Sequence, residues 1–144
     1  MTRVLIIDDE EPIRLLCRVN LEAEGMEVIE AFDGEQGIEL ARTELPDVIL
    51  LDVMMPRLDG WDVAQRLAAG EPTKEIPIVF LTARAEVRDR ARGLDIGGVE
   101  YVTKPFNPLE LAPLIADLLA RIKRDGIDLL RGEKLAELRA LVHE

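Results

Sequence analysis

The sequence predicts an α/β fold, a doubly wound parallel sheet of five strands with helices on both faces. Short apolar runs such as residues 48–51 are typical of strands that are buried on both sides. These runs alternate along the chain with segments whose apolar residues recur at helical spacing, and the connections between them are short. Alternation of this kind favours a parallel sheet built from right-handed crossovers.

Each predicted strand is an apolar run that stops at a polar or turn residue. The five strands cover residues 4–7, 26–31, 47–51, 78–81 and 99–102. The helices that follow them cover residues 12–25, 34–44, 61–69, 87–96 and 108–123. Gly25 and the pair Gly97-Gly98 end two of these helices. Pro113 lies inside the last helix and is expected to bend its first turns.

The end of the chain is predicted to form a further helix. Residues 1–124 complete five strand-helix units, and Asp125-Gly126 then provides a break. We therefore expect one domain over 1–124 and a helical extension or linker over 125–144, interrupted by Gly132. Its apolar stripe should pack on the domain, on a second copy of the chain or on an output module, because exposed apolar surface is costly. The stripe consists of Leu135, Leu138, Leu141 and Val142. A frayed tail is the alternative, since an isolated helix of this length is marginally stable.

Composition excludes several classes of protein. A chain of 144 residues with 48% hydrophobic content can bury one sizeable core. Its apolar runs are far shorter than the ~20 residues of a membrane-spanning helix, and no signal peptide is evident, so a cytoplasmic location is expected. The single cysteine, Cys17, excludes an internal disulfide framework and is expected in the core. A net charge of -11 would repel nucleic acid and anionic membranes, so neither is expected as a partner.

Polar side chains follow four of the predicted strands. They are Asp8 and Asp9, Asp52, Thr82 and Lys104. In a doubly wound sheet, ligands bind beyond the carboxyl ends of the strands, so these residues should meet at one edge. Taken singly, each could be a helix cap or a solvated loop residue. Taken together, crowded carboxylates repel one another unless a cation compensates them, and a bound metal and Lys104 would do so.

The type of ligand indicates which metal the site would hold. Carboxylate oxygens without His or Cys favour Mg²⁺, Mn²⁺ or Ca²⁺ over Zn²⁺. Mg²⁺ is preferred, with Mn²⁺ as a substitute. Because Mg²⁺ binds few carboxylates and leaves positions for water and phosphate oxygens, the site indicates phosphoryl chemistry.

In addition, the chain resembles the receiver domains of bacterial two-component response regulators. The resemblance covers about residues 1–123 and rests on an ordered set of motifs. These are Leu5-Ile6-Ile7-Asp8-Asp9-Glu10, Asp47 to Pro56 with Asp59-Gly60, Leu81-Thr82-Ala83, and Tyr101 to Phe106. The resemblance implies a flavodoxin-like fold with strand order 2-1-3-4-5, a phosphorylation-dependent switch, and no activity beyond its own phosphorylation and dephosphorylation.

The resemblance also implies roles for individual residues. Asp52 would take the phosphoryl group from a phosphohistidine of a sensor histidine kinase or phosphotransfer protein. The metal would be held by Asp8, Asp9, Asp52 and the backbone carbonyl of Met54, and Lys104 would pair with Asp52 and then with the phosphoryl group. The metal and the lysine would neutralise the charge that gathers on the transferred oxygens.

Further along the chain, Thr82 and Tyr101 resemble the switch pair of the family, and Lys104-Pro105 resembles its cis peptide. A half-buried strand aromatic is the alternative interpretation of Tyr101. The pattern through which many family members dimerise is interrupted at residues 98–100 and 112–114. The output partner is therefore undetermined: a separate protein, an output domain that these residues do not include, or a second copy of the chain.

Three other functions can be weighed against this interpretation. An aspartyl-phosphate hydrolase would carry a second Asp two residues beyond the nucleophile, where this sequence has Met54. In a flavin-binding domain, the loop Asp8-Asp9-Glu10 would repel the flavin phosphate. A receiver-like interaction module that is never phosphorylated would have no need for the full set of charged residues.

Overall fold

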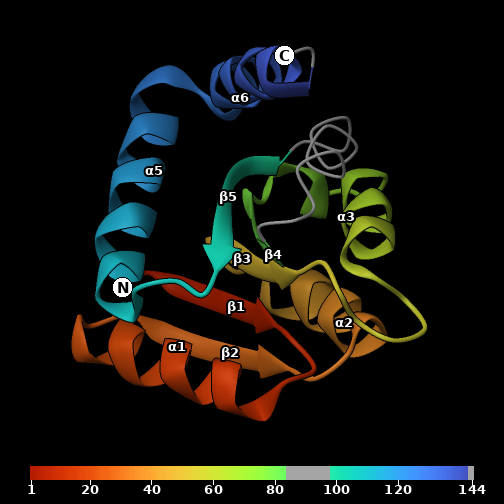
Figure 1. The fold of residues 1–144 in the computed structure, drawn as a ribbon, viewed down its shortest axis with the longest axis vertical. Helices are drawn as coiled ribbons and strands as arrows, with labels where there is room; N and C mark the ends of the chain where they lie inside the picture. Colours follow the sequence, from red (N-terminus) through yellow and green to blue (C-terminus); the bar gives the residue numbers. More distant parts are fainter. Residues whose placement is uncertain (84–97, 143–144) are drawn as a thin grey trace.

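The chain forms one five-stranded parallel sheet in a computed structural model that describes residues 1–83 and 98–142, except for the side chains of 141 and 142 (Figure 1). Its strands are β1 (Arg3–Ile7), β2 (Glu27–Ala31), β3 (Val48–Asp52), β4 (Ile78–Ala83) and β5 (Gly98–Lys104). They lie in the order β2-β1-β3-β4-β5. The doubly wound sheet and the strand order 2-1-3-4-5 are confirmed, and only the ends of the strands differ from the prediction.

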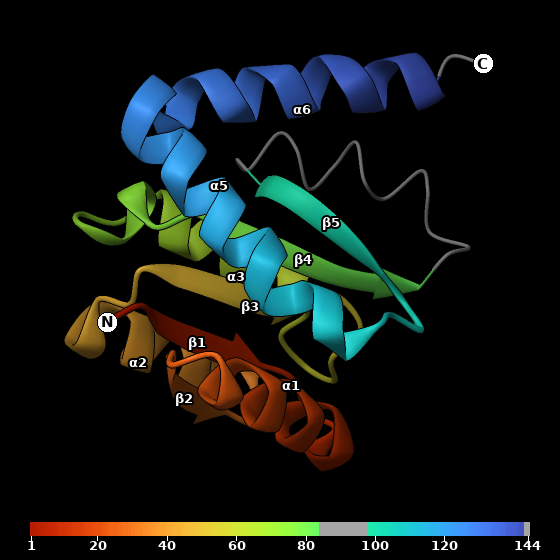
Figure 2. The same cartoon turned by 90° about the vertical axis from the view of Figure 1, so that its left-hand side faces the viewer.

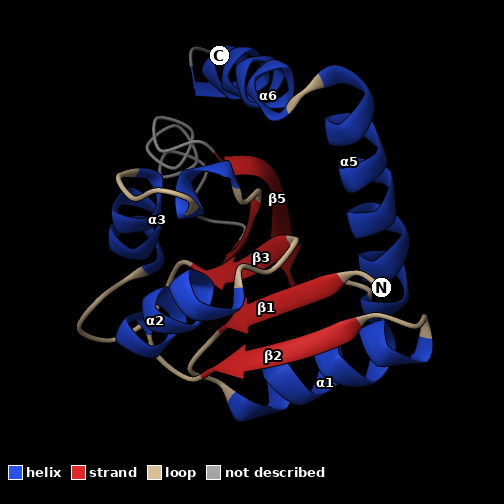
Figure 3. Cartoon of the chain, turned by 180° about the vertical axis from the view of Figure 1, so that it is seen from behind, coloured by secondary structure: helices blue, strands red, loops and turns tan. Residues whose placement is uncertain are grey.

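Helices cover both faces of the sheet (Figures 2 and 3). On one face lie α1 (Glu11–Ala23) and α5 (Leu111–Asp125), and on the other lie α2 (Gly34–Glu44) and α3 (Gly60–Ala68). Successive side chains of a strand point to opposite faces of the sheet. Val4 therefore belongs to the first core, between the sheet and α1 and α5, and Leu5 to the second core, between the sheet and α2 and α3. Cys17 is buried in the first core, as expected, and burial raises the pKa of its thiol to about 12.

The start of α5 differs from the prediction. A short 3-10 helix, η2 (Pro108–Glu110), comes first, and the α-helix begins only at Leu111. Pro113 therefore lies in the first turn of α5, where backbone N–H groups have no partner within the helix and a proline is tolerated. The predicted helix over 87–96 lies outside the described residues.

The expected extra helix is present as α6 (Ile127–Val142). Gly132 does not interrupt it, contrary to the prediction, because the helix is held by its contacts with the domain and not by local propensity alone. Leu138 is buried, and Leu130, which the predicted stripe did not include, is buried as well. The boundary between residues 124 and 125 stays a prediction. Within the described ranges, no helix is long and apolar enough to cross a lipid bilayer.

Strand register decides which side chains share the carboxyl edge of the sheet. Ile7 of β1 pairs with Leu51 of β3, so the residues that follow, Asp8 and Asp52, lie side by side. Lys104 ends β5 beside the last residue of β4. The sheet therefore delivers both carboxylates and the lysine to the same edge.

Candidate functional site

Lys104 holds the two buried carboxylates of the site together. Its Nζ lies 3.2 Å from Oδ2 of Asp8 and 3.3 Å from Oδ1 of Asp52. Oε1 of Glu10 is slightly farther away, at 3.7 Å. Since these groups come from three different strand ends, the parallel sheet itself creates the ion-pair network.

Hydrogen bonding differs between the two buried carboxylates. Asp8 uses both oxygens: Oδ1 accepts from the backbone N–H of Glu10 at 2.9 Å, and Oδ2 accepts from Lys104. In Asp52, Oδ1 accepts from Lys104 and from the backbone N–H of Met54 at 3.3 Å. Its Oδ2 is buried and has no hydrogen-bond partner among the described residues. A buried polar atom of this kind carries a desolvation penalty that a bound cation or a new covalent bond would relieve.

Burial changes the protonation of these groups. Burial and, to a lesser extent, the neighbouring charge of Asp8 raise the pKa of Asp52 to about 7, although Lys104 opposes both effects. The pKa of Asp8 is also raised, chiefly by burial. For Lys104, burial acts to lower the pKa, but Asp52 and Asp8 outweigh it and leave that pKa raised. One cation therefore compensates two carboxylates incompletely, and the site favours a second positive charge.

The residues present fit a hard divalent cation. Asp8, Asp9, Glu10 and Asp52 each offer one carboxylate oxygen, and these oxygens all lie within 4.8 Å of one another. Asp9 is exposed and lies before α1, whose capping residue, Glu10, makes no side-chain capping bond. A capping role for Asp9 thus has no support. Met54 lies beside the site through its backbone N–H, but its carbonyl as a metal ligand stays a prediction.

Glu10 is the one member of this carboxylate group for which sequence reasoning predicted no role. Glu10 is part of the motif on which the family resemblance rests. The site residues, however, were predicted from their position directly after a strand, and Glu10 lies farther along the chain. The turn in which Asp8 accepts from the N–H of Glu10 brings this third carboxylate back toward the site.

Thr82 and Tyr101 occupy neighbouring strands. Thr82 is buried at the end of β4, and its Oγ1 donates to the carbonyl of Ala83 at 3.4 Å. Tyr101 in β5 is half-buried, and its ring stacks on Phe80 with 5.3 Å between centroids. A Cβ added at Gly98 would lie 3.2 Å from the Tyr101 hydroxyl, so the ring points back toward the start of β5. The switch role of this pair stays a prediction.

The loop after β3 is held tightly against the site. Asp59 and Asp62 form a reciprocal capping box at the start of α3. The N–H of Gly60 donates to the carbonyl of Val53 at 2.9 Å. A Cβ at Gly60 would overlap the backbone carbonyl oxygen of Asp52, so only glycine permits this close approach.

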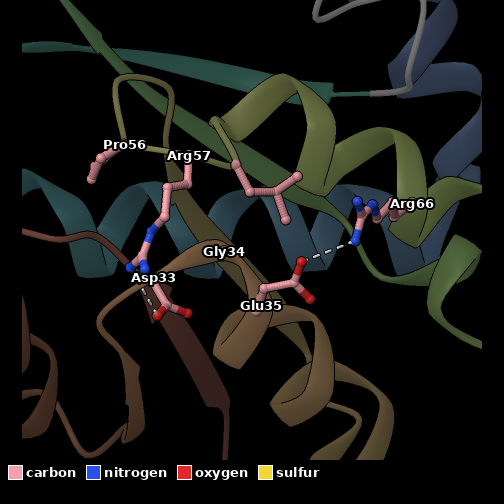
Figure 4. A pocket seen from close by; sticks show the side chains of 7 residues that line it. Asp33, Gly34, Glu35, Pro56, Arg57 and Arg66 are labelled. Atoms are coloured by element: carbon pink, nitrogen blue, oxygen red, sulfur yellow. Dashed lines mark hydrogen bonds and ion pairs between the residues drawn. The ribbon is translucent and has the colours of Figure 1, made fainter.

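A separate hollow of about 350 Å³ lies between this loop and the start of α2 (Figure 4). Two ion pairs line it, Arg57 with Asp33 at 3.8 Å and Arg66 with Glu35 at 3.2 Å. Its charged groups are thus paired with one another, and none of the carboxylates around Lys104 lines it.

Comparison with known proteins agrees with this geometry. Residues 4–116 match the family described as the response regulator receiver domain. The chain is a receiver domain of this family. Such domains act as signalling switches and do not turn over a metabolite, which argues against the hydrolase alternative. They bind Mg²⁺ at an acidic pocket and interact with histidine kinases or phosphotransfer partners.

Two curated relatives are transcriptional regulators. This receiver domain is 44% identical over 124 residues to the DNA-binding dual master transcriptional regulator RpaA of Synechocystis, covering 86% of this chain and 52% of the relative. It is also 44% identical over 119 residues to the alkaline phosphatase synthesis transcriptional regulatory protein PhoP of Bacillus subtilis, covering 83% of this chain and 48% of the relative. The receiver domain thus spans about half the length of these proteins.

Solved structures show the same fold. Chemotaxis protein CheY4 of Vibrio cholerae has a TM-score of 0.77 at 31% identity, covering 81% of this receiver domain and 98% of that chain. The receiver domain of sensor histidine kinase PA1611 from Pseudomonas aeruginosa has a TM-score of 0.76 at 29% identity, covering 83% and 98%. That structure is described as having a magnesium ion coordinated in the active site cleft.

Proposed function

We propose that Asp52 accepts a phosphoryl group from a phosphohistidine of a sensor histidine kinase or phosphotransfer protein, and that the modified domain changes its binding to a partner. The observation that carries the proposal is Oδ2 of Asp52. This oxygen is buried and has no hydrogen-bond partner in the described part of the chain. It belongs to a cluster of four acidic residues whose negative charge Lys104 partly compensates. As this oxygen bonds to phosphorus, the bond from phosphorus to the donor imidazole breaks and the imidazole retains the electron pair.

The proposed metal is Mg²⁺, with Mn²⁺ as a substitute. Asp8, Asp9, Asp52 and the backbone carbonyl of Met54 would hold it, and Glu10 is close enough to contribute through water. When bound, the ion would neutralise charge on the transferred oxygens. The raised pKa of Asp52 supports this requirement, because a carboxyl group with a pKa of about 7 is partly protonated, and hence a poorer nucleophile, at neutral pH without a cation.

Lys104 would act on both sides of the transfer. Before it, the ammonium group orients Oδ1 of Asp52 and favours its ionised form, opposing the burial that raises the pKa of this carboxyl group. After it, the same group can pair with a phosphoryl oxygen, and Asp8 retains its own bond to the lysine. The lysine therefore stabilises charge and transfers no proton.

The experiment that tests this function is intact-mass measurement after incubation with acetyl phosphate, with and without Mg²⁺. We expect one added phosphoryl group on the unmodified protein with Mg²⁺ and none with a chelator. Asp52→Asn should remove the label, and Asp117→Asn, at an exposed position on α5, should retain it. Equal labelling of Asp52→Asn would mean a different acceptor. No labelling of the unmodified protein would favour the interaction module that is never phosphorylated.

Thr82 is the proposed transmitter to Tyr101. A phosphoryl group adds negative charge and strong acceptor oxygens, which would draw the Thr82 hydroxyl and open space for the ring of Tyr101. Tyr101 is the single tyrosine of the chain, so 3-fluorotyrosine would give one fluorine resonance. Thr82→Ala should keep Asp52 phosphorylation but lose the shift of this resonance, whereas Thr43→Ala on α2 should keep both. A full shift in Thr82→Ala would remove Thr82 from the switch.

For the output of the whole protein, the proposal takes the curated relatives as its guide. They are transcriptional regulators of which this chain matches about half, so an output module beyond these residues is one candidate. A partner protein and a second copy of the chain are the others. The proposed division is a receiver domain over 1–124 and a connecting extension over 125–144. A cytoplasmic location is part of the same proposal, because the phosphohistidine donor would be there.

A further inference from the structure

The C-terminal helix α6 does not lead away from the domain. After Gly126 the chain turns, and α6 lies across the end of the sheet at which β5 begins, beside β5 and the end of α5 (Figures 1 and 2). Leu130 and Leu138 are 3% and 2% exposed. These two side chains lie eight residues apart, so one face of the helix is buried over more than two turns.

Polar contacts fix the position of α6 on three elements. Lys134 Nζ lies 2.8 Å from Oε1 of Glu100 in β5, and both side chains are largely buried. Arg131 donates to the carbonyl of Lys74 in η1 (Thr73–Glu75) at 2.8 Å. Glu133 pairs with an arginine of α5 at 2.9 Å. The helix is thus docked in a defined position and is not a frayed tail.

The contact between Lys134 and Glu100 leads directly to Tyr101. The same Oε1 of Glu100 also accepts from the backbone N–H of Tyr101 at 2.9 Å. Here the pairing of β4 and β5 is irregular: Ile78 pairs with Gly98 but Val79 pairs with Glu100, so one residue of β5 is extra. At such a bulge the regular hydrogen bonds between the strands are interrupted, and the backbone N–H of Tyr101 donates to the side chain of Glu100 instead.

We propose that α6 is an intramolecular regulatory element whose docking on β5 is linked to the state of Asp52 through Glu100 and Tyr101. The inference rests on the proposed function, in which phosphorylation of Asp52 moves Tyr101. One carboxylate oxygen accepts from both Lys134 and the backbone N–H of Tyr101, so a movement of Tyr101 that shifts the β5 backbone disturbs the anchor of α6. Docked α6 therefore favours the unphosphorylated domain, and phosphorylation favours release of α6.

By thermodynamic linkage the effect is reciprocal. If phosphorylation lowers the equilibrium constant for α6 docking by some factor, loss of docking raises the equilibrium constant for phosphorylation by the same factor. The first test is amide hydrogen exchange of residues 127–140 in the full chain, with acetyl phosphate and Mg²⁺, alongside intact mass of the same sample. We expect exchange in α6 to rise about fivefold or more in the phosphorylated protein and to stay unchanged in Asp52→Asn. A sample that is phosphorylated by mass but shows unchanged exchange in α6 overturns the inference and leaves the proposed function intact. A sample that takes no phosphoryl group overturns the function itself.

The second test breaks the anchor directly. Lys134→Met should speed exchange in α6 before phosphorylation and raise, by a similar factor, the ratio of phosphorylated to unphosphorylated protein at limiting acetyl phosphate. Arg139→Met, at an exposed position on the same helix, should change neither quantity. If Lys134→Met loosens α6 without changing this ratio, the two sites are not linked and the inference is wrong.

Discussion

Asp52→Asn is expected to raise the free energy of unfolding of the metal-free protein at pH 8 by on the order of 2 kcal/mol. Most substitutions of buried residues destabilise, so the sign is diagnostic. The gain comes from removing a carboxylate that is buried beside Asp8 with only Lys104 to compensate both. An amide of the same shape keeps the packing and removes the charge.

The pH dependence follows from the pKa of the same carboxyl group. Burial and Asp8 raise it from an ordinary value of 3.8 to about 7 in the folded state. Between these values the folded protein binds a proton that the unfolded chain has released. The resulting stabilisation is fully present below about 3.8 and is lost as the pH rises through about 7. The unmodified protein should therefore lose stability between pH 5 and pH 8, and Asp52→Asn should lose much less.

Urea unfolding of both proteins at pH 5 and pH 8, with a chelator, measures the gain in stability of Asp52→Asn at pH 8 and the loss of stability of each protein between the two pH values. The single histidine, His143, is present in both proteins and cancels in the comparison. Added Mg²⁺ should restore stability to the unmodified protein at pH 8 and have less effect on the Asn variant. An equal loss of stability in both proteins would show that the pKa of Asp52 is not raised.

The second large effect concerns Asp9. Asp9→Ala is expected to weaken Mg²⁺ binding about tenfold or more, because it removes one of the few carboxylates proposed to hold the ion. Metal-free stability should hold or rise, since Asp9 is exposed and its loss relieves repulsion within the carboxylate group. Calorimetric titration with Mg²⁺ and thermal unfolding in chelator provide the two measurements.

Glu11→Ala is the matched control for Asp9→Ala. Glu11 is an exposed acidic residue two positions away, in the first turn of α1, and it is not a member of the carboxylate group. It should leave Mg²⁺ affinity nearly unchanged. If Glu11→Ala weakened binding as much as Asp9→Ala, general negative charge and not direct ligation would explain the effect. A marked loss of metal-free stability in Asp9→Ala would instead support a structural role.

Local patterns were sufficient to predict the sheet and most of its helices. The helix over 34–44 was predicted with its observed ends because its apolar residues recur on one face, and the structure shows in addition that Asp33 caps it. The gathering of Asp8, Asp52 and Lys104 followed from a general rule about parallel sheets, since strand ends must meet at one edge. The cis peptide at Lys104-Pro105 is present as well, as the resemblance implied.

What the sequence did not predict depends on contacts between distant residues. Leu130 became part of the core because α6 folds back over β5, and no local periodicity carries the position at which a helix docks. The pair Lys134–Glu100 joins residues 34 positions apart, and the bulge that brings Glu100 to the N–H of Tyr101 arises from strand pairing. Glu10 was passed over because a turn, and not a strand, directs it to the site.

The close approach of Gly60 to Asp52 means that the backbone is packed more rigidly on one side of the proposed phosphoacceptor than on the other. On the β3–α3 side, Gly60 packs directly against the backbone of Asp52, and the capping box of Asp59 and Asp62 fixes the turn. The backbone on that side is therefore rigid. On the other side, β5 pairs irregularly with β4, and the ring of Tyr101 stacks on Phe80. Strain introduced at Asp52 should therefore be relieved toward β5, which gives the signal a direction of travel before any partner binds.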